Sequence, residues 1–488
     1  MNKHVIVLGA GNAAFAAAVS ARQNGAKVTM IERAPEDEAG GNTRFTAGAI
    51  RCVYDGVDDL RAIMPDLTDQ EIDRTDFGSY TEADFFDDMG RVTDYRTDPD
   101  LCELLVTRSR ETMRWMKDCG IKFAPIWGRQ AFQVDGKFKF WGGLTVEAWG
   151  GGEGLYEGWQ AVAEKAGIKI RFGTRAVSLL VNDSGVIGVK LKSEGKSEDL
   201  LGEAVIIATG GIQANTEWRT RYLGPSWDLA KVRGTRFSTG DGLKMALDAG
   251  AMPYGNWSGC HAVGWERNAP EFGELSVGDG FQKHSYPFGV LINGLGQRFV
   301  DEGADFRNYT YAKYGREVLA QPGQFAWQIF DQKVAHLLRD EYRIKQVTKV
   351  TAQTLEDLVQ KLEDVDADAA LQTLQSYNAA VDDTKAFNPN IKDGRATVGL
   401  GLNKTNWANR LDEPPFEAYA ITCGITFTFG GLRITNAGQV MDVNLAPING
   451  LYAAGEVIGG IFYGNYPGGS GLMSGAVFGK IAGLSAAA

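Results

Sequence analysis

Glycine turns and one well-spaced carboxylate are the residues in this sequence that first suggest chemistry. Gly9, Gly11 and Ala14 form a Gly-x-Gly-x-x-Ala pattern. The first glycine of such a pattern permits a tight turn, the second lets the backbone approach a pyrophosphate, and the third small residue keeps the helix close to the strand. Glu32 follows about 20 residues later, where a carboxylate can accept hydrogen bonds from ribose hydroxyls. The pattern predicts a dinucleotide site, and the acid favours FAD or NAD over NADP.

The elements that must position this turn can be read from its flanks. Residues 4–8 are apolar and rich in β-branched side chains, which predicts a strand. An alanine-rich helix is expected after the turn, ending near Gly25, with its N-terminus facing the phosphates. Residues 27–31 predict a second strand that ends at Glu32. A glycine turn alone can be structural, but strand, helix and acid in register favour nucleotide binding.

Three later segments favour FAD over NAD. Residues 40–48 form a loop of small residues whose backbone can lie flat against a large planar ligand. Residues 204–211 predict a buried strand ending in a glycine turn, where a doubly wound sheet offers its carboxyl edge to a ligand. Residues 448–456 lead into the glycine-rich run 468–472 and a terminal helix, whose positive end would stabilise a reduced, anionic flavin.

Length and composition bound the architecture. The chain has 488 residues, 44% of them hydrophobic and 23% charged, which suits more than one globular unit at ~150 residues per domain. From about Met252 the alternation of strands and helices gives way to an aromatic, glycine-rich stretch and then to a helical pattern over 354–381. We predict an α/β fold with a discontinuous, Rossmann-like FAD-binding domain (1–252 and 413–488) and an inserted α+β capping domain (253–412).

Charge and cysteine content exclude several functions. Fifty basic against 61 acidic residues give a net charge of −11, which argues against nucleic-acid binding and against anchoring to anionic lipid. The five cysteines lie far apart, without a C-x-x-C pair, and no histidines cluster at metal spacing, so reduced thiols and no metal site are expected. No apolar run is long enough to predict a membrane span. We expect a cytoplasmic enzyme acting on a small molecule, with an external electron acceptor or redox partner, because iron–sulfur and haem motifs are absent.

Taken together, the sequence resembles the flavoprotein family of fumarate reductase and succinate dehydrogenase over essentially the whole chain, and within it the FAD-dependent tricarballylate dehydrogenases. The likeness rests on residues 32–35 with 40–43, on 140–143 with 150–152, on 423–432 and on 462–471. The resemblance implies that Thr43 lies near flavin N5, that Asp241 and Glu456 contact the ribityl and phosphate region, and that the Val177 backbone contacts the adenine. Respiratory members attach flavin through a histidine in the loop at 41–44, which has none here, so non-covalent FAD is expected.

The predicted cofactor-binding residues come from the glycine turns, the strand ends and the start of the terminal helix. They are Gly9, Gly11, Asn12, Ala13, Glu32, Arg33, Gly41, Asn42, Thr43, Gly48, Val177, Ala208, Thr209, Gly210, Asp241, Gly455, Glu456, Ser470, Gly471 and Leu472. Most of them are small, as a backbone that must approach a ligand closely requires.

Candidate catalytic residues follow from the resemblance and from the positions at which this sequence lacks the family's residues. His261 matches the spacing at which fumarate reductases place a substrate-binding histidine, and His284 and Tyr286 fall where they carry a proton-donating arginine. Their second histidine and their Arg-Leu-Gly-Gly clamp are absent, so fumarate reduction by the family mechanism is not expected. The Tyr-Pro-Gly pattern at Tyr466 is similar to that of ketosteroid Δ1-dehydrogenases, in which the tyrosine polarises a carbonyl oxygen.

Forming a double bond beside a carbonyl removes a proton from the α-carbon and a hydride from the β-carbon, so the site needs a base and an oxyanion donor. Tyr466 is the expected donor, and Tyr286 or His284 the expected base. Carboxylates of the substrate would be held by positive groups next to these segments. The predicted substrate-binding residues are Arg44, Arg233, Arg236, Lys283 and Gly469. Each of the arginines could equally form an ordinary ion pair.

Three functions remain open at this stage. The leading hypothesis is α,β-dehydrogenation of a small polycarboxylate, such as tricarballylate to cis-aconitate. The second is an α,β-desaturase of a cyclic ketone, of the ketosteroid Δ1-dehydrogenase or oxocyclohexanecarboxylate type, whose apolar ring would suit the aromatic side chains Trp257, Trp265, Phe272, Phe281 and Phe288. The third is a flavin-binding redox partner without turnover of its own.

Overall fold

The computed structural model describes residues 3–488 and is organised around two sheets. The first has six strands in the order β20-β21-β13-β1-β2-β9. Strands β1, β2, β9, β13 and β21 run parallel and β20 closes the edge antiparallel. Their bounds are β1 His4–Leu8, β2 Lys27–Ile31, β9 Lys169–Arg171, β13 Ala204–Ile207, β20 Gln439–Met441 and β21 Pro447–Ala453. Because β1 and β13 are covered on both faces, their sequences are continuous apolar runs, as the sequence indicated.

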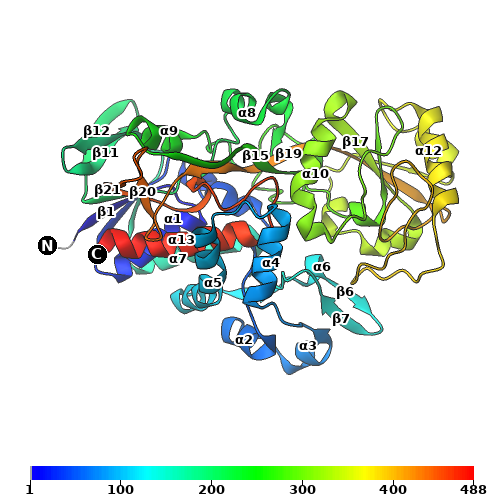
Figure 1. The fold of residues 1–488 in the computed structure, drawn as a ribbon, viewed down its shortest axis with the longest axis horizontal. Coiled ribbons are helices and arrows are strands. Elements are labelled where there is room, and N and C mark those ends of the chain that lie inside the picture. Colours follow the sequence, from blue (N-terminus) through cyan, green and yellow to red (C-terminus); the bar gives the residue numbers. More distant parts are fainter. Residues whose placement is uncertain (1–2) are drawn as a thin grey trace.

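Helices α1 (Asn12–Gln23) and α13 (Ser470–Ala487) lie side by side against this sheet, although they come from opposite ends of the chain (Figure 1). Glycines four residues apart in α13 permit this close packing. A Cβ at Gly479 would lie 2.6 Å from the carbonyl oxygen of Ala13, and one at Gly483 would lie 2.2 Å from that of Ala17. The two termini of the chain therefore build one face of the same domain.

The second sheet has the order β14-β19-β17-β16, with β15 and β18 also paired to β19. Its bounds are β14 Lys231–Val232, β15 Pro253–Glu266, β16 Val290–Asn293, β17 Phe325–Phe330, β18 Lys349–Ala352 and β19 Phe416–Leu432. The strand expected at 416–422 thus continues to Leu432, and β19 runs from the far end of the molecule toward the first sheet (Figure 1). The division at residues 252 and 412 stays a prediction, since β19 joins strands from both sides of it.

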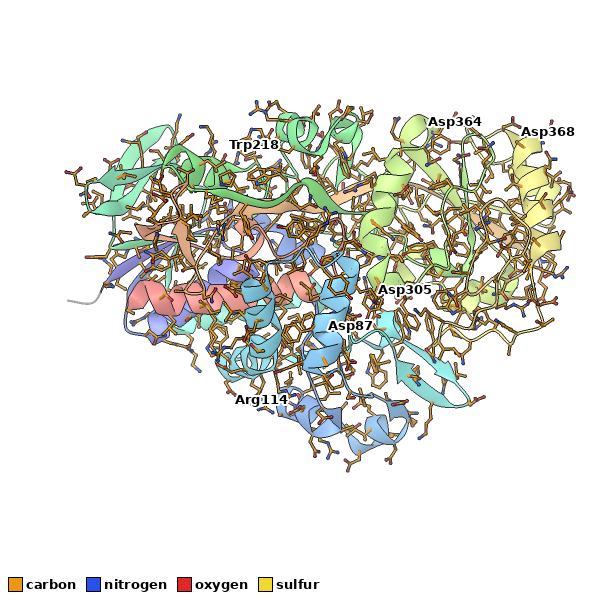
Figure 2. The ribbon with its side chains drawn as sticks, in the orientation of Figure 1. Asp87, Arg114, Trp218, Asp305, Asp364 and Asp368 are labelled. Atoms are coloured by element: carbon orange, nitrogen blue, oxygen red, sulfur yellow. The ribbon has the colours of Figure 1, made fainter. Side chains whose placement is uncertain are left out.

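The part of the chain between β15 and β19 has a hydrophobic core of its own, which includes Val290, Trp327 and Leu374. The helical stretch expected over 354–381 is two helices, α11 (Leu355–Val359) and α12 (Ala367–Ala380). They are separate because the Asp366 side chain accepts a hydrogen bond from the Ala369 amide and begins α12 anew. Charged side chains such as Asp364 and Asp368 cover the outside of this end (Figure 2).

The remaining elements surround the two sheets. The helices are α2 Gly56–Ile63, α3 Asp69–Asp73, α4 Glu82–Val92, α5 Pro99–Cys119, α6 Trp127–Gln130, α7 Gly151–Lys165, α8 Thr216–Leu223, α9 Asp241–Asp248 and α10 Tyr311–Leu319. The strands are β3 Ala49–Ile50, β4 Thr75–Asp76, β5 Phe123–Pro125, β6 Ala131–Val134, β7 Lys137–Phe140, β8 Val146–Ala148, β10 Arg175–Asn182, β11 Gly185–Ser193 and β12 Lys196–Leu201. Over residues 3–488, no helix is long and apolar enough to cross a membrane, and no cluster of acidic, histidine and cysteine side chains is arranged for a metal ion.

Candidate active site

A cavity of about 260 Å³ lies where the first sheet meets the second. Gly9, Glu32 and Thr209 reach it from the carboxyl ends of β1, β2 and β13, while His261 and Phe427 reach it from β15 and β19. The carboxyl edge of a parallel sheet is the usual place for a ligand, and here the second sheet covers that edge.

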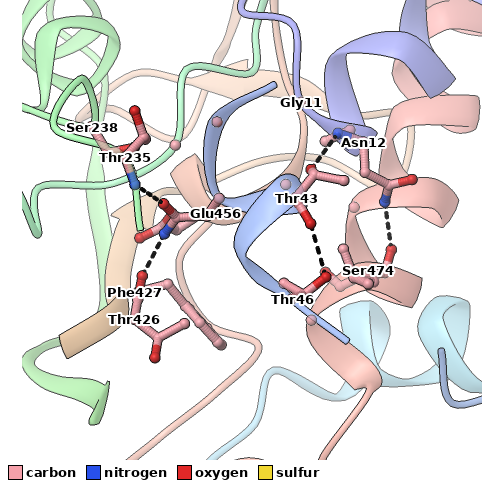
Figure 3. Close-up of a pocket in the computed structure, with 18 of the residues that line it drawn as sticks. Gly11, Asn12, Thr43, Thr46, Thr235, Ser238, Thr426, Phe427, Glu456 and Ser474 are labelled. Carbon is pink, nitrogen blue, oxygen red and sulfur yellow. Dashed lines mark hydrogen bonds between the residues drawn. The ribbon is translucent and has the colours of Figure 1, made fainter. Parts of the chain in front are cut away.

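One end of the cavity, at the start of α1, has the features of a phosphate-binding site. The N-terminus of α1 has no side-chain cap, and the first helical amide, that of Asn12, donates to Thr43 Oγ1 at 2.9 Å (Figure 3). Gly9 has φ +111°, and a Cβ there would lie 2.3 Å from the carbonyl oxygen of Ala208. Only glycine can therefore occupy this turn, and the helix end offers positive dipole and free amides to an anion.

Acidic side chains line the part of the cavity where the sequence predicts contact with ribose. Glu32 is buried at the end of β2 and accepts a hydrogen bond from the Ala34 amide at 2.7 Å. Burial raises the pKa of the Glu32 carboxyl above its ordinary value. The Asp241 carboxylate is held by Arg33 at 3.0 Å and by Arg175 at 2.8 and 2.9 Å, so it orients these two arginines at the rim.

Segments distant in sequence are tied together at the middle of the cavity. Asn42 donates to the carbonyl oxygen of Thr426 at 2.6 Å and accepts from the Thr235 amide at 3.0 Å (Figure 3). Glu456 accepts from the Thr428 amide at 2.8 Å, and burial raises the pKa of its carboxyl to about 7. These contacts join the glycine loop 40–48, and the segment after β21 that carries Glu456, to the second sheet.

Most predicted cofactor-binding residues line this cavity: Gly9, Gly11, Asn12, Ala13, Glu32, Arg33, Gly41, Asn42, Thr43, Ala208, Thr209, Gly210, Asp241, Gly455, Glu456, Gly471 and Leu472. Their contact with a cofactor stays a prediction. Three others do not line it. The Val177 side chain is exposed while Ala176 lines the cavity, because neighbouring residues of a strand face opposite sides; the contact predicted for the Val177 backbone stays a prediction. Gly48 is glycine because a Cβ would lie 2.6 Å from the backbone of Gly151, and Ser470 Oγ donates to the carbonyl oxygen of Pro467 at 2.5 Å.

The other end of the cavity holds a pair of tyrosines and a histidine. The hydroxyl groups of Tyr466 and Tyr311 are hydrogen-bonded to each other. The His261 ring lies 4.8 Å from the ring of Tyr466 and 4.9 Å from that of Tyr311. Burial raises the pKa of Tyr466 well above its ordinary value and, with a smaller effect of Arg233, lowers the pKa of His261 well below its own. All three groups are therefore neutral near pH 7.

Arginines gather at this same end. Arg233 makes a forked contact with Asp279, from Nε at 2.9 Å and Nη2 at 2.6 Å, and Arg129 Nη1 contacts the other oxygen of Asp279 at 2.9 Å. Arg307 donates to the carbonyl oxygen of Arg129 at 3.0 Å but has no carboxylate within 4.0 Å among residues 3–488. Burial lowers the pKa of Arg307 to about 10, and the group stays charged at neutral pH.

Two predicted bases lie outside the cavity. The Tyr286 hydroxyl is hydrogen-bonded to Thr310 Oγ1 at 2.6 Å, and burial raises its pKa rather than lowering it. The His284 ring lies 4.9 Å from that of Tyr311 but does not line this cavity; it lines a smaller one. The prediction that either is the base at this cavity is corrected accordingly.

Three predicted substrate-binding residues also lie elsewhere because other groups hold them. Arg44 makes a forked contact with Glu153 at 2.6 and 2.7 Å. Arg236 is half-exposed and pairs with Glu38 at 2.6 Å. Lys283 is buried against the carbonyl oxygens of residues 280–282 at 3.3 to 3.4 Å. Arg233 and Gly469 do line the cavity, as His261 and Tyr466 do.

Sequence reasoning missed Arg129, Arg307 and Tyr311, which line the cavity. Arg307 and Tyr311 share one short stretch, Arg-Asn-Tyr-Thr-Tyr, whose cation and two phenols were a usable signal. Arg129 had no such signal. None of the aromatic residues expected to hold an apolar ring lines the cavity; Phe427, Phe429 and Phe462 do so instead.

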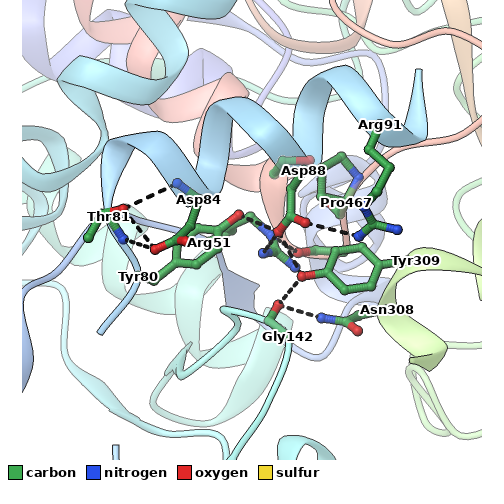
Figure 4. Close-up of polar contacts among 12 residues, drawn as sticks. Arg51, Tyr80, Thr81, Asp84, Asp88, Arg91, Gly142, Asn308, Tyr309 and Pro467 are labelled. Carbon is green, nitrogen blue, oxygen red and sulfur yellow. Dashed lines mark hydrogen bonds and ion pairs between the residues drawn. The ribbon is translucent and has the colours of Figure 1, made fainter. Parts of the chain in front are cut away.

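A buried polar network around Asp88 on α4 fixes the tyrosine end of the cavity (Figure 4). Asp88 accepts hydrogen bonds from the hydroxyls of Tyr80 and Tyr309 at 2.7 Å each and from the buried Arg51 at 3.3 Å. Arg51 in turn donates to the carbonyl oxygen of Gly468 at 2.8 Å. The network therefore ties the turn that carries Arg307 to the loop that carries Tyr466.

A protein-family model described as FAD binding domain matches residues 4–472. The chain belongs to this family. A probable fumarate reductase, Ifc3, of Shewanella frigidimarina is 29% identical over 99% of this chain and 74% of that protein. A 3-oxosteroid 1-dehydrogenase of Mycolicibacterium smegmatis is 26% identical over 66% of this chain and 60% of its own length.

Solved structures agree with this assignment. The open conformation of a flavocytochrome c3 fumarate reductase has a TM-score of 0.73 at 25% identity, covering 99% of this chain and 78% of that one. A 3-ketosteroid Δ1-dehydrogenase of Sterolibacterium denitrificans, at 19% identity, shares the fold with a TM-score of 0.75 over 99% of both chains. The predicted fold class, FAD as cofactor and an FAD-dependent oxidoreductase acting on CH–CH groups are confirmed, as is the likeness to fumarate reductase flavoproteins. This excludes a flavin-binding partner without turnover.

The residues present fit FAD. The helices α1 and α13 both begin at the cavity without a side-chain cap, and the turn at Gly9 leaves no room for a Cβ. When bound, FAD supplies the acceptor for a hydride. The chain itself supplies the charges of its arginines and the tyrosine hydroxyl groups that line the cavity, and its second sheet covers the cavity.

Proposed function

We propose that this enzyme dehydrogenates a small saturated polycarboxylate, such as tricarballylate, to its α,β-unsaturated product, here cis-aconitate. The observation that carries the proposal is the surplus of buried arginines at the tyrosine end of the cavity. Arg129 and Arg233 share a single carboxylate, that of Asp279. Arg307 and its buried neighbour Arg339 have no carboxylate within 4.0 Å in the described chain.

The charge balance favours an anionic substrate. An uncompensated buried charge costs several kcal/mol, and the chain carries a net charge of −11, so these cations are not part of a generally basic surface. The buried Glu341 carboxylate attracts Arg129, Arg307 and Arg339 without lying within 4.0 Å of any of them, so it offsets part of this charge. A substrate with two or three carboxylates would offset the surplus, and forked arginine contacts would hold it in register.

The tyrosine pair supplies the donor and the base. Burial raises the pKa of Tyr311, and the hydrogen bond from Tyr466, followed by Arg233 and Arg307, opposes the rise. The pKa of Tyr466 is raised well above its ordinary value. Tyr466 therefore keeps its proton and donates a hydrogen bond to a carboxyl oxygen. Tyr311 is the phenol of the pair that Arg233 and Arg307 help to deprotonate, and its phenolate, a minor form near pH 7, takes the α-proton and becomes the phenol as the hydride leaves the β-carbon.

A cyclic ketone is the second candidate substrate. The rings of Phe427 and Phe462 lie 5.2 and 5.4 Å from that of Tyr466, Phe429 packs against both phenylalanines, and all three line the cavity. An apolar ring could lie on them with its carbonyl oxygen at the Tyr466 hydroxyl. A steroid-like ketone gives the unpaired arginines no role and an oxocyclohexanecarboxylate offers them a single carboxylate, which is why we rank this alternative second.

Anaerobic titration of the yellow holoenzyme tests the proposal. We expect tricarballylate to bleach the visible absorbance of the flavin, while 4-oxocyclohexanecarboxylate and a 3-ketosteroid leave it unchanged. Bleaching by a ketone alone would reverse the ranking, and bleaching by none of them would reject both substrates. Dithionite serves as the control that the bound flavin can be reduced.

We also propose that FAD is bound non-covalently and that its electrons pass to an external acceptor. The loop Gly41–Phe45 carries no histidine, which supports non-covalent binding. Acid precipitation should then leave the yellow colour in the supernatant. Two relatives from Shewanella frigidimarina are named fumarate reductase (cytochrome), which supports an external redox partner as the acceptor for this chain.

A further inference from the structure

A second, smaller cavity of about 20 Å³ adjoins the tyrosine end of the active-site cavity. Its apolar walls include Trp141, Phe288 and Trp407, and its polar walls include His284, Arg307 and Arg339. Arg307 also lines the active-site cavity, so this one side chain forms part of the wall between the two. The volume exceeds the 10–15 Å³ or so that one water needs, which leaves space for one small polar group.

The polar walls of this cavity carry atoms that lack partners. Both ring nitrogens of His284, Nε of Arg307 and Nη1 of Arg339 are buried and have no hydrogen-bond partner within residues 3–488. The three residues are 1%, 7% and 6% exposed. Buried polar atoms are nearly always paired in folded proteins, because an unpaired one has lost its hydrogen bonds to water without replacement. Several unpaired donors facing one small space therefore indicate a missing acceptor.

The chemistry of these donors selects an anion. Arg307 and Arg339 are cations, and each donates one hydrogen bond to the carbonyl oxygen of Arg129. Burial and the surrounding arginines lower the pKa of His284 well below its ordinary value, so its ring is neutral and can donate one N–H. Aromatic walls exclude water and lower the local dielectric constant, which strengthens a contact between a guanidinium and a carboxylate.

We propose that the second cavity is a subsite for a distal carboxylate of the substrate, held by Arg339 and His284. The inference deepens the proposed function and rests on it. The ring of Tyr311 lies 4.9 Å from that of His261 in the active-site cavity and 4.9 Å from that of His284 in the second one, and Arg307 lines both cavities. A carboxylate in the subsite therefore lies next to the tyrosine end of the active-site cavity, apart from the two that flank the reacting carbons. The subsite distinguishes a tricarboxylate from a dicarboxylate.

The contribution of the subsite to affinity can be measured without turnover, as the Kd of a ligand for the oxidised holoenzyme. The probes are cis-aconitate, with three carboxylates, and maleate, which lacks the third; both are already unsaturated. Arg339→Met should raise the Kd of cis-aconitate at least about tenfold, as expected for a lost charge-assisted hydrogen bond, and change that of maleate less than about twofold. Arg343→Met is the matched control, because Arg343 is exposed on the same segment and pairs only with Asp340 and nearby backbone. It should alter neither Kd.

The outcomes separate the two proposals. If Arg339→Met changes both dissociation constants equally, or neither, the subsite is rejected while the polycarboxylate function stands. If the unaltered holoenzyme binds neither acid, both proposals fall. Flavin content and thermal unfolding report whether each variant is folded. His284→Gln is the second variant, expected to show the same selective loss for cis-aconitate, and it decides the matter if Arg339→Met does not fold.

Discussion

Replacing Tyr466 by phenylalanine removes one oxygen atom from the tyrosine end of the cavity and leaves the ring in place. That ring packs against Phe427 at 5.2 Å and Phe462 at 5.4 Å, and the side chain is 6% exposed, so its apolar contacts persist. The hydrogen bond to the Tyr311 hydroxyl is lost. The variant therefore isolates the hydroxyl group.

Two magnitudes follow. Losing one donor to a developing oxyanion costs about 10²–10³-fold in rate, or roughly 3–4 kcal/mol of transition-state stabilisation. Losing one buried hydrogen bond costs the folded state about 1 kcal/mol, and up to ~3 kcal/mol if the Tyr311 hydroxyl finds no other partner. The effect on flavin reduction should thus exceed the effect on stability, and FAD should stay bound.

The assay is anaerobic stopped-flow reduction of the holoenzyme by tricarballylate, together with thermal unfolding. Tyr314→Phe is the matched control: Tyr314 lies on the same helix as Tyr311, its buried hydroxyl donates to the carbonyl oxygen of Asp301, and it does not line the cavity. It should lose similar stability and reduce its flavin at the normal rate. Unchanged flavin reduction in Tyr466→Phe, or an equal slowing in both variants, would refute the role of the Tyr466 hydroxyl.

Three further predictions concern the supports of the site. Asp88→Asn leaves the fully buried Arg51 without its charge partner, so we expect the free energy of unfolding, measured by denaturant titration, to fall by about 3–5 kcal/mol. Asp84→Asn, at the exposed third position of the capping box of the same helix, should lower it by only about 1 kcal/mol. Burial lowers the pKa of Lys404 from 10.5 to about 8, so the folded state resists protonation; this penalty is fully present below pH 8 and is relieved toward pH 10.5. The stability of the parent relative to Lys404→Met should therefore rise by about 3 kcal/mol between these pH values, and a flat difference would contradict the buried position of the amine. Glu32→Gln should raise the Kd of FAD about tenfold or more by fluorescence titration, whereas Glu36→Gln, exposed nearby, should not.

The nucleotide half of the site could be predicted because its signals are local. A strand, a turn that only glycine fits, a helix and an acid follow one another within residues 4–32, and their spacing alone determines where they meet. The same holds for the strand at 204–207 and for the terminal helix. Backbone geometry and hydrogen bonding within short segments decide such units whatever surrounds them.

The choice between neighbouring residues could not be predicted. Whether Val177 or Ala176 faces the cavity depends on the register of β10 in its sheet, and a shift of one residue exchanges the two faces. His261 and His284 were both candidates for the site, yet they line two different cavities. In sequence, Arg44 and Arg236 lie as close to the predicted site as Arg233 does. In the structure, ion pairs with Glu153 and Glu38 hold them away from the cavity.

The sequence by itself determined the fold class, the place of the dinucleotide turn and the flavin-binding segments, because each is encoded in contiguous residues with strict steric needs. Only the tertiary structure decided which cations and phenols meet at the substrate end. Arg129 and Arg233 lie far in sequence from the stretch that carries Arg307 and Tyr311, and they converge because the long strand β19 and the Asp88 network bring these segments together. Contacts between distant segments depend on packing of the whole chain, which no spacing in the sequence records.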